Sequence, residues 1–128
     1  MSMYEVKDHP VFEQVIRRLE KGDYTISYST EWFFATVTLR FKNGFCKGIK
    51  FDLDYTRFED EEETCRSIKT YVRPGFFSTS QYIETTQLPE ELKYRLIAIA
   101  DKLVADKKKA VAIAHENSIV TTLDKAFE

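Results

Sequence analysis

The spacing of hydrophobic residues predicts an amphipathic helix at the start of the chain. Apolar side chains recur at helical spacing over residues 10–21, and charged side chains fall between them. Asp8 or His9 is placed to cap this helix, and Gly22 to end it. The stripe is continuous enough for us to expect that the helix packs against another element.

The hydrophobic period then changes from that of a helix to that of a strand. Apolar and polar residues alternate over residues 24–29, 32–41 and 45–55, which predicts three strands. The odd-numbered residues of the second and third strands form the apolar face. We therefore assign five phenylalanines to an ordinary core: Phe12, Phe33, Phe41, Phe45 and Phe51.

The second and third strands are predicted to form a hairpin. A two-residue Asn43-Gly44 turn would place Val37 opposite Lys50, so that an apolar side chain faces a charged one. A three-residue loop over 42–44, with Gly44 left-handed, places Val37 opposite Ile49 and keeps both apolar sets on one face. We therefore expect the three-residue loop.

The region that follows allows two interpretations. Residues 59–63 are all acidic. The spacing of the apolar residues Phe58, Cys65, Ile68 and Val72 suits a helix with these acidic residues in its first turn. Residues 67–72 have the composition of a strand instead, and Pro74-Gly75 would form a type II turn into a strand over 76–85. We favour the hairpin, so whether 59–72 is a helix or a loop and strand stays open.

Helical spacing returns from Pro89 to the end of the sequence. Lys107, Lys108 and Lys109 interrupt the apolar stripe, and Asn117 or Ser118 is placed to stop one helix and cap another. An unbroken helix over 89–116 would be about 42 Å long at 1.5 Å per residue, beyond the diameter of about 36 Å expected for this domain. Such a helix must fold back or meet a second subunit.

These elements define an α+β fold in a single domain, residues 1–128. It consists of an N-terminal helix, an antiparallel meander of four to five strands, and a C-terminal helical region packed on the sheet. A chain of 128 residues that is 43% hydrophobic can bury one core.

Charge and composition narrow the partners and the location. The net charge of −2 argues against a duplex-DNA binder, which needs a basic excess for phosphate contacts. The sequence begins without an apolar signal-like run and has no stretch long enough to span a membrane, so we expect no membrane partner. Two cysteines in a chain with a core are typical of free thiols, which favours a cytoplasmic location.

Catalytic chemistry has little support. Asp52 and Asp54 lie two apart on one strand face and could hold a divalent metal, but no third ligand is placed beside them. His9 and His115 are far apart in the sequence, and none of the four glycines forms a phosphate-binding loop. We therefore expect no catalytic residue, no metal, no cofactor and no enzymatic activity.

Two groups of residues are better candidates for binding a partner. The expected register sets aromatic and charged side chains together on the second face of the hairpin, and the predicted Pro74-Gly75 turn presents a further set. The predicted partner-binding residues are Trp32, Phe34, Arg40, Lys50, Asp52 and Asp54 on that face, and Arg73, Phe76 and Phe77 in the turn. Exposed aromatics beside charges are typical of binding hot spots. Whether a helix covers the face of Trp32 and Phe34 is left open.

We therefore predict a small cytoplasmic protein that binds another protein, of unknown identity, as an inhibitor, chaperone or adaptor. Self-association through the C-terminal helical region is part of this hypothesis. One alternative is a binder of single-stranded nucleic acid or nucleotides on the face of Trp32 and Phe34. A second alternative is a metal-dependent hydrolase built on Asp52 and Asp54.

Overall fold

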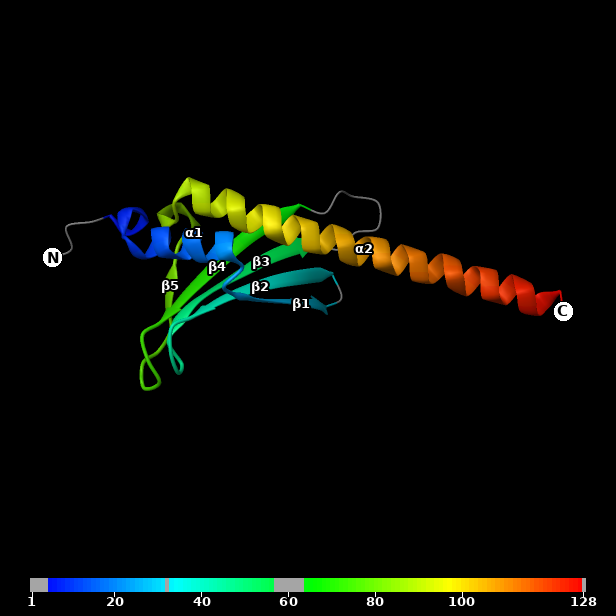
Figure 1. Ribbon diagram of the computed structural model, residues 1–128, viewed down its shortest axis with the longest axis horizontal. Helices are drawn as coiled ribbons and strands as arrows, with labels where there is room; N and C mark the ends of the chain where they lie inside the picture. The colour runs from blue at the N-terminus through cyan, green and yellow to red at the C-terminus, as the bar shows by residue number, and fades with distance from the viewer. Residues whose placement is uncertain (1–4, 32, 57–63, 128) are drawn as a thin grey trace.

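The computed structural model describes residues 5–31, 33–56 and 64–127, and it has an α+β architecture (Figure 1). Two helices, two 3-10 turns and five strands follow one another along the described chain. In order they are η1 (Val6–Asp8), α1 (Val11–Lys21), β1 (Thr25–Glu31), β2 (Phe34–Lys42), β3 (Gly48–Thr56), β4 (Cys65–Arg73), β5 (Gln81–Ile83), η2 (Thr85–Gln87) and α2 (Glu90–Ala126).

The N-terminal helix forms where the pattern predicts it. Gly22 ends α1 in the left-handed conformation, with φ of 71°, as expected for a glycine after a helix. At the other end Pro10 is the N-cap residue, and the Nδ1 of His9, one residue earlier, accepts a hydrogen bond of 3.1 Å from the Val11 N–H.

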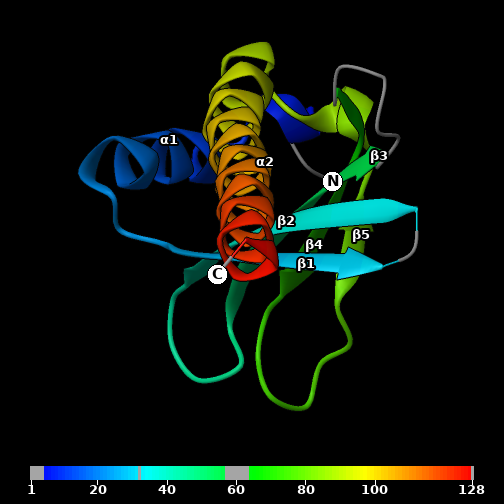
Figure 2. The same ribbon diagram turned by 90° about the vertical axis from the view of Figure 1, so that its right-hand side faces the viewer.

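The five strands form one antiparallel sheet in sequence order, β1-β2-β3-β4-β5. Both helices lie on the same side of this meander, and the opposite side is open (Figures 1 and 2). Buried residues of α1, α2, β2, β3 and β4 form a single core cluster. On β2 and β3 the buried residues are the odd-numbered ones, from Ala35 to Phe41 and from Ile49 to Tyr55, as the alternation predicts.

The predicted register of the β2–β3 hairpin is wrong by four residues. Phe41 lies opposite Ile49 and Val37 opposite Leu53, so the connection is the five-residue loop 43–47. Within that loop the Asn43 N–H donates to the Lys47 carbonyl at 2.8 Å. A shift of four preserves the alternation, so the buried face is correct although the cross-strand partners are not.

Two phenylalanines assigned to the core are exposed, because the strands that were expected to hold them begin later in the sequence. Phe45 lies in the loop, not in β3, and Phe33 lies in the turn before β2. Phe12, Phe41 and Phe51 are buried, as predicted.

Strand β4 begins at Cys65, which decides the ambiguous region in favour of a strand from that residue on; residues 57–63 lie outside the described residues. The predicted type II turn is wrong, because Gly75 does not have the positive φ that this turn requires. Strand β5 is three residues long, so the loop 74–80 carries Phe76 and Phe77.

Helix α2 is continuous for 37 residues, about 55 Å at 1.5 Å per residue. Of the two outcomes expected for a long C-terminal helix, the helix continues past 107–109 and does not fold back there, whereas the stop and new cap predicted at 117–118 are wrong. Its sequence contains no glycine or proline, and exposed lysines are good helix formers. Buried positions end at Val104, and the Lys107 Nζ lies 5.9 Å from the ring centre of Tyr28. From there the helix projects beyond the sheet (Figure 1).

A membrane-crossing helix, long and apolar enough for that purpose, is absent from the described part of the chain.

Candidate functional site

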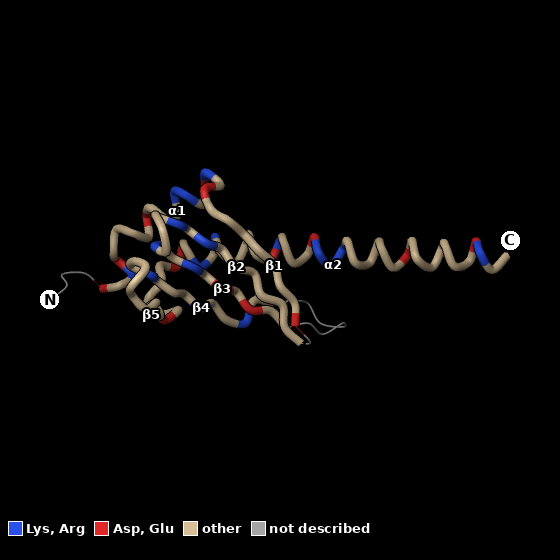
Figure 3. Tube along the Cα trace, turned by 90° about the horizontal axis from the view of Figure 1, so that it is seen from below, with Lys and Arg blue, Asp and Glu red and all other residues tan. Residues whose placement is uncertain are grey.

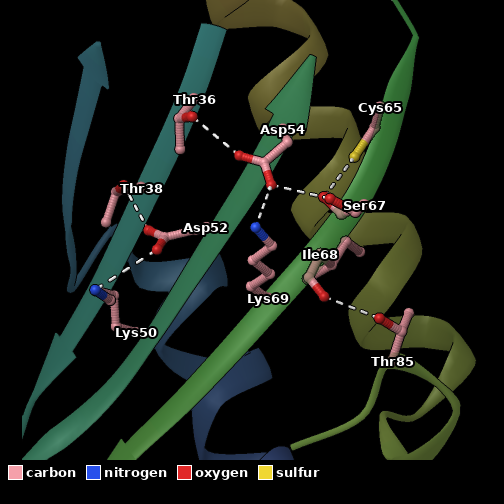
Figure 4. Close-up of polar contacts among 10 residues, drawn as sticks. All are labelled: Thr36, Thr38, Lys50, Asp52, Asp54, Cys65, Ser67, Ile68, Lys69 and Thr85. Atoms are coloured by element: carbon pink, nitrogen blue, oxygen red, sulfur yellow. Dashed lines mark hydrogen bonds and ion pairs between the residues drawn. The ribbon is translucent and has the colours of Figure 1, made fainter. Parts of the chain in front are cut away.

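The open face of the sheet carries a polar network across β2, β3 and β4 (Figure 4). The Thr36 hydroxyl donates to Asp54 Oδ1 at 2.9 Å, and the Ser67 hydroxyl donates to Asp54 Oδ2 at 2.9 Å. The Lys69 ammonium lies 3.6 Å from the same Oδ2. Asp54 therefore bridges three strands.

Asp52 has a similar set of partners one step along β3. The Thr38 hydroxyl donates to Asp52 Oδ1 at 2.7 Å, and the Lys50 ammonium lies 3.5 Å from Oδ2. Lys50 also lies over the ring of Tyr71, 4.9 Å from its centre. In the described ranges no three His, Cys, Asp or Glu side chains come together as metal ligands. The two carboxylates thus bind groups of the protein itself.

The corrected register separates residues that were expected to lie side by side. The expected register would set Phe34 opposite Asp52 and Arg40 opposite Cys46. Instead Phe34 is opposite Thr56 and Glu31, and its side chain is exposed at the end of β2. Arg40 is opposite Lys50. Trp32 lies outside the described residues. The structure therefore brings Arg40, Lys50, Asp52 and Asp54 onto one face, with Phe34 at its end.

Three exposed aromatic rings, Phe45, Phe76 and Phe77, form a second group, which we call the aromatic tip. They come from the loops 43–47 and 74–80, which project together beyond one end of the sheet (Figures 1 and 2). Phe45 stacks on Phe76 with 5.5 Å between ring centres, and Phe76 meets Phe77 edge-on at 4.9 Å. Arg73 braces the second loop, because its guanidinium donates to the carbonyls of Gly75 and Phe76 at 3.3 and 3.1 Å.

Sequence reasoning found two members of the aromatic tip and missed the third. Phe45 was assigned to a strand, since it continues the odd-numbered alternation of β3. The second glycine of the segment, Gly48, is the signal that could have moved the strand start.

Two cavities flank the base of these loops. One, of about 500 Å³, lies between α1 and the sheet and has a mainly apolar wall that includes Phe12, Val15 and Ile49. The other, of about 450 Å³, opens beside Phe45 and is lined by five cationic side chains: Arg40, Lys42, Lys47, Lys50 and Arg73.

A polar cluster, in which Tyr55 is buried, Cys65 half-buried and Asp101 exposed, links β3 and β4 to α2. The Tyr55 hydroxyl donates to Asp101 Oδ1 at 2.7 Å. A bulge skips Arg66 in the β3–β4 pairing and sets Cys65 opposite Tyr55. Burial, followed by the nearby Asp101 carboxylate, raises the pKa of the Cys65 thiol to about 11. Burial and the hydrogen bond to Asp101 raise the pKa of the Tyr55 phenol well above its ordinary range.

The projecting part of α2 presents a third surface. Ile113, Val120 and Phe127 follow one another at intervals of seven, with Leu123 between the last two, and all four are exposed. We call these four residues the distal stripe. At 100° per residue, Ile113 and Val120 lie about 180° and about 160° around the axis from buried Val104. The distal stripe is therefore not a continuation of the face that packs on the sheet.

Charged residues are sparse in this region. Glu116 is the one Asp, Glu, Lys or Arg residue between 110 and 123. The charge-coloured trace shows the same contrast with the rest of the protein (Figure 3).

No protein-family model, curated protein or solved structure matches this chain.

Proposed function

We propose that the protein acts by binding other proteins, without catalysis, and that the distal stripe of α2 pairs with the same stripe of a second copy. The observation that carries this proposal is the exposed apolar repeat at intervals of seven on the part of α2 that projects beyond the sheet. Apolar residues at heptad spacing are typical of helices that pack against helices.

The energetics of the isolated helix support a partner. About 22 residues of α2 follow Val104, its last buried residue, and most of the stability of a helix in a protein comes from packing of an apolar face against another element. Burial of Ile113, Val120, Leu123 and Phe127 against another helix would stabilise the projection.

A second copy is favoured over a different partner for two reasons. The stripe is self-complementary in a two-fold arrangement, because each copy offers the same apolar side chains. In addition, the stretch 110–123 has almost no charge, so two copies meet with little repulsion.

Sedimentation of the full chain tests this proposal. We expect the wild type to be a dimer and Val120→Asp to raise the dissociation constant at least about a hundredfold, since an unpaired carboxylate is costly to bury. Val111→Asp is the matched control. Val111 is 70% exposed on the same segment and lies about 180° around the axis from Val120.

The outcomes separate the possible occupants. Dimers of wild type and Val111→Asp, with monomers of Val120→Asp, support pairing through the distal stripe. A monomeric wild type would exclude a second copy as the occupant and leave a helix of another protein. Equal loss in both variants would contradict the assignment to the stripe.

The binding class within this proposal is an inhibitor, chaperone or adaptor, and the cytoplasmic location stays a prediction. A second candidate, binding of single-stranded nucleic acid on the open sheet face, is favoured by the exposed Arg40 and Phe34. Salt-sensitive binding of an oligonucleotide that is lost in Phe34→Ala would support it, and unchanged binding would contradict it.

A further inference from the structure

The aromatic tip has no role in the core. Phe45, Phe76 and Phe77 are 81, 54 and 97% exposed, and their ring contacts are mainly with one another. An exposed apolar group of this kind marks a surface that another phase or molecule covers. We propose that the aromatic tip inserts into the surface of an anionic lipid membrane.

Cations lie immediately behind the tip. The cavity that opens beside Phe45 is lined by Arg40, Lys42, Lys47, Lys50 and Arg73, which we call the basic collar, and no carboxylate lines it. Lys50 is 3.5 Å from Asp52, whereas no ion pair joins Arg40, Lys42 or Lys47 to a carboxylate within the described residues. The basic collar therefore keeps an excess of positive charge.

The order of these groups matches the layers of a membrane interface. Phe45 is the middle residue of the loop 43–47, and Phe76 and Phe77 belong to the loop 74–80. Four of the five cations belong to the strands that these loops connect: Arg40, Lys42, Lys50 and Arg73. Rings that enter the acyl boundary would therefore leave the cations at the depth of the anionic headgroups. Phosphatidylserine supplies the negative charge that the collar requires.

The three rings lie against one another and present one joint apolar surface. Phe45 stacks on Phe76 and Phe77 meets Phe76 edge-on, so the group offers apolar area rather than a row of separate stacking platforms. Insertion into a bilayer requires apolar area of this kind.

The composition alone predicts no membrane partner, because it contains no spanning segment. Insertion at the surface needs none. The five cations are scattered between residues 40 and 73, and the sheet brings them together beside the loops. This surface is separate from the distal stripe, so the proposal does not depend on dimerisation.

Co-sedimentation of the full chain with vesicles tests the proposal. We expect binding to vesicles of phosphatidylcholine with phosphatidylserine, weaker binding to phosphatidylcholine alone, and a decrease with added salt. Phe77→Ser should weaken binding about tenfold through the loss of one inserted ring. Lys42→Glu should weaken it about fivefold or more through the collar.

Two variants on α2 serve as matched controls. Tyr94 is an aromatic residue that is 70% exposed across the sheet from the tip, and Lys102 is an exposed cation on the same helix. Tyr94→Ser and Lys102→Glu should bind as the wild type does.

Three results would overturn the proposal. The first is equal binding to the neutral and the anionic vesicles. The second is an equal loss in the tip variants and the α2 controls. The third is binding of a single-stranded oligonucleotide, sensitive to Phe77→Ser, in a protein that leaves vesicles unbound. Thermal melts of each variant confirm that a loss of binding is not a loss of fold, as expected for a 97% exposed Phe77.

Discussion

The phenol of Tyr55 on the central strand β3 donates a 2.7 Å hydrogen bond to the Asp101 carboxylate on α2. The Tyr55 side chain is fully buried, while Asp101 is on the exposed side of its helix turn. This bond fixes α2 over the sheet at the last stretch of the helix that is still packed, three residues before Val104. The projection of the rest of α2 therefore has its direction set here.

Removal of that hydrogen bond should loosen the base of the projecting helix. We expect Tyr55→Phe to lower the free energy of unfolding by about 1–2 kcal/mol, because a hydrogen bond to a charged acceptor is lost while Asp101 can be hydrated. Urea unfolding followed by circular dichroism measures the change. Tyr94→Phe, which removes an exposed hydroxyl, should stay within about 0.5 kcal/mol of the wild type. Equal losses in the two variants would contradict a role for the bond.

The same cluster predicts a decrease in stability at alkaline pH. The folded state raises the pKa of Cys65 from its ordinary value near 9 to about 11, so the unfolded chain loses this proton first. The stabilisation is complete below about pH 9 and is lost as the pH rises to about 11. Tyr55 acts in the same direction from about pH 10, its ordinary value.

Urea unfolding from about pH 8 to about pH 11 measures this dependence. Cys65→Ala should have a shallower decrease between about pH 9 and pH 10 than the wild type, whatever its stability at neutral pH. Parallel curves for the two proteins would show that the thiol does not contribute.

Period and alternation were sufficient to predict α1, the strands β1 to β3 and the buried face of β2 and β3, but they left residues 59–72 open between a helix and a strand. They were not sufficient for the β2–β3 register, because pairing Val37 with Ile49 or with Leu53 sets apolar residues opposite each other equally well. The choice depends on backbone geometry at Gly48, where the chain passes close to the carbonyl of Phe41. Spacing of side chains carries no information about that approach.

The candidate surfaces were predictable in part. Phe76 and Phe77 were predicted to bind a partner because they are adjacent aromatic residues in a turn. Phe45 lies beside them only because the β2–β3 loop has five residues, and the expected loop had three. The basic collar draws Arg40 and Arg73 from strands that are not neighbours, so it requires the complete sheet order. A break of the C-terminal helix at the three adjacent lysines was one of two alternatives, and the unbroken helix is the one that forms, because exposed lysines cost a helix little.

The close approach at Gly48 gives a direct test of the hairpin. Its φ is 154°, and a Cβ there would lie 2.3 Å from the Phe41 carbonyl oxygen, a backbone atom held in β2. We expect Gly48→Ala to lower the free energy of unfolding by about 2 kcal/mol or more. Gly75 is the matched control, since a Cβ there meets open space and its φ is not positive. Gly75→Ala should be neutral or stabilising by up to about 1 kcal/mol. A neutral Gly48→Ala would contradict the five-residue loop and restore the shorter one.

Thr70 offers an opportunity to stabilise the protein. It lies on the buried face of β4 between Phe51 and Ile83, and its hydroxyl has no hydrogen-bond partner among the described residues. A buried hydroxyl without a partner has lost its hydrogen bonds to water, and no hydrogen bond within the protein replaces them. Thr70→Val keeps the shape of the side chain and should therefore raise the free energy of unfolding by about 1 kcal/mol.

The contrasting variant for Thr70 is Thr85→Val. The Thr85 hydroxyl donates to the Ile68 carbonyl at 2.9 Å, so the same substitution there removes a hydrogen bond and should cost about 1 kcal/mol. Urea unfolding of both variants under one set of conditions separates the two effects, because both substitutions replace a hydroxyl by a methyl group and the sign depends on the hydrogen-bond partner. A loss of stability in Thr70→Val equal to that in Thr85→Val would show that the Thr70 hydroxyl is hydrogen-bonded in solution.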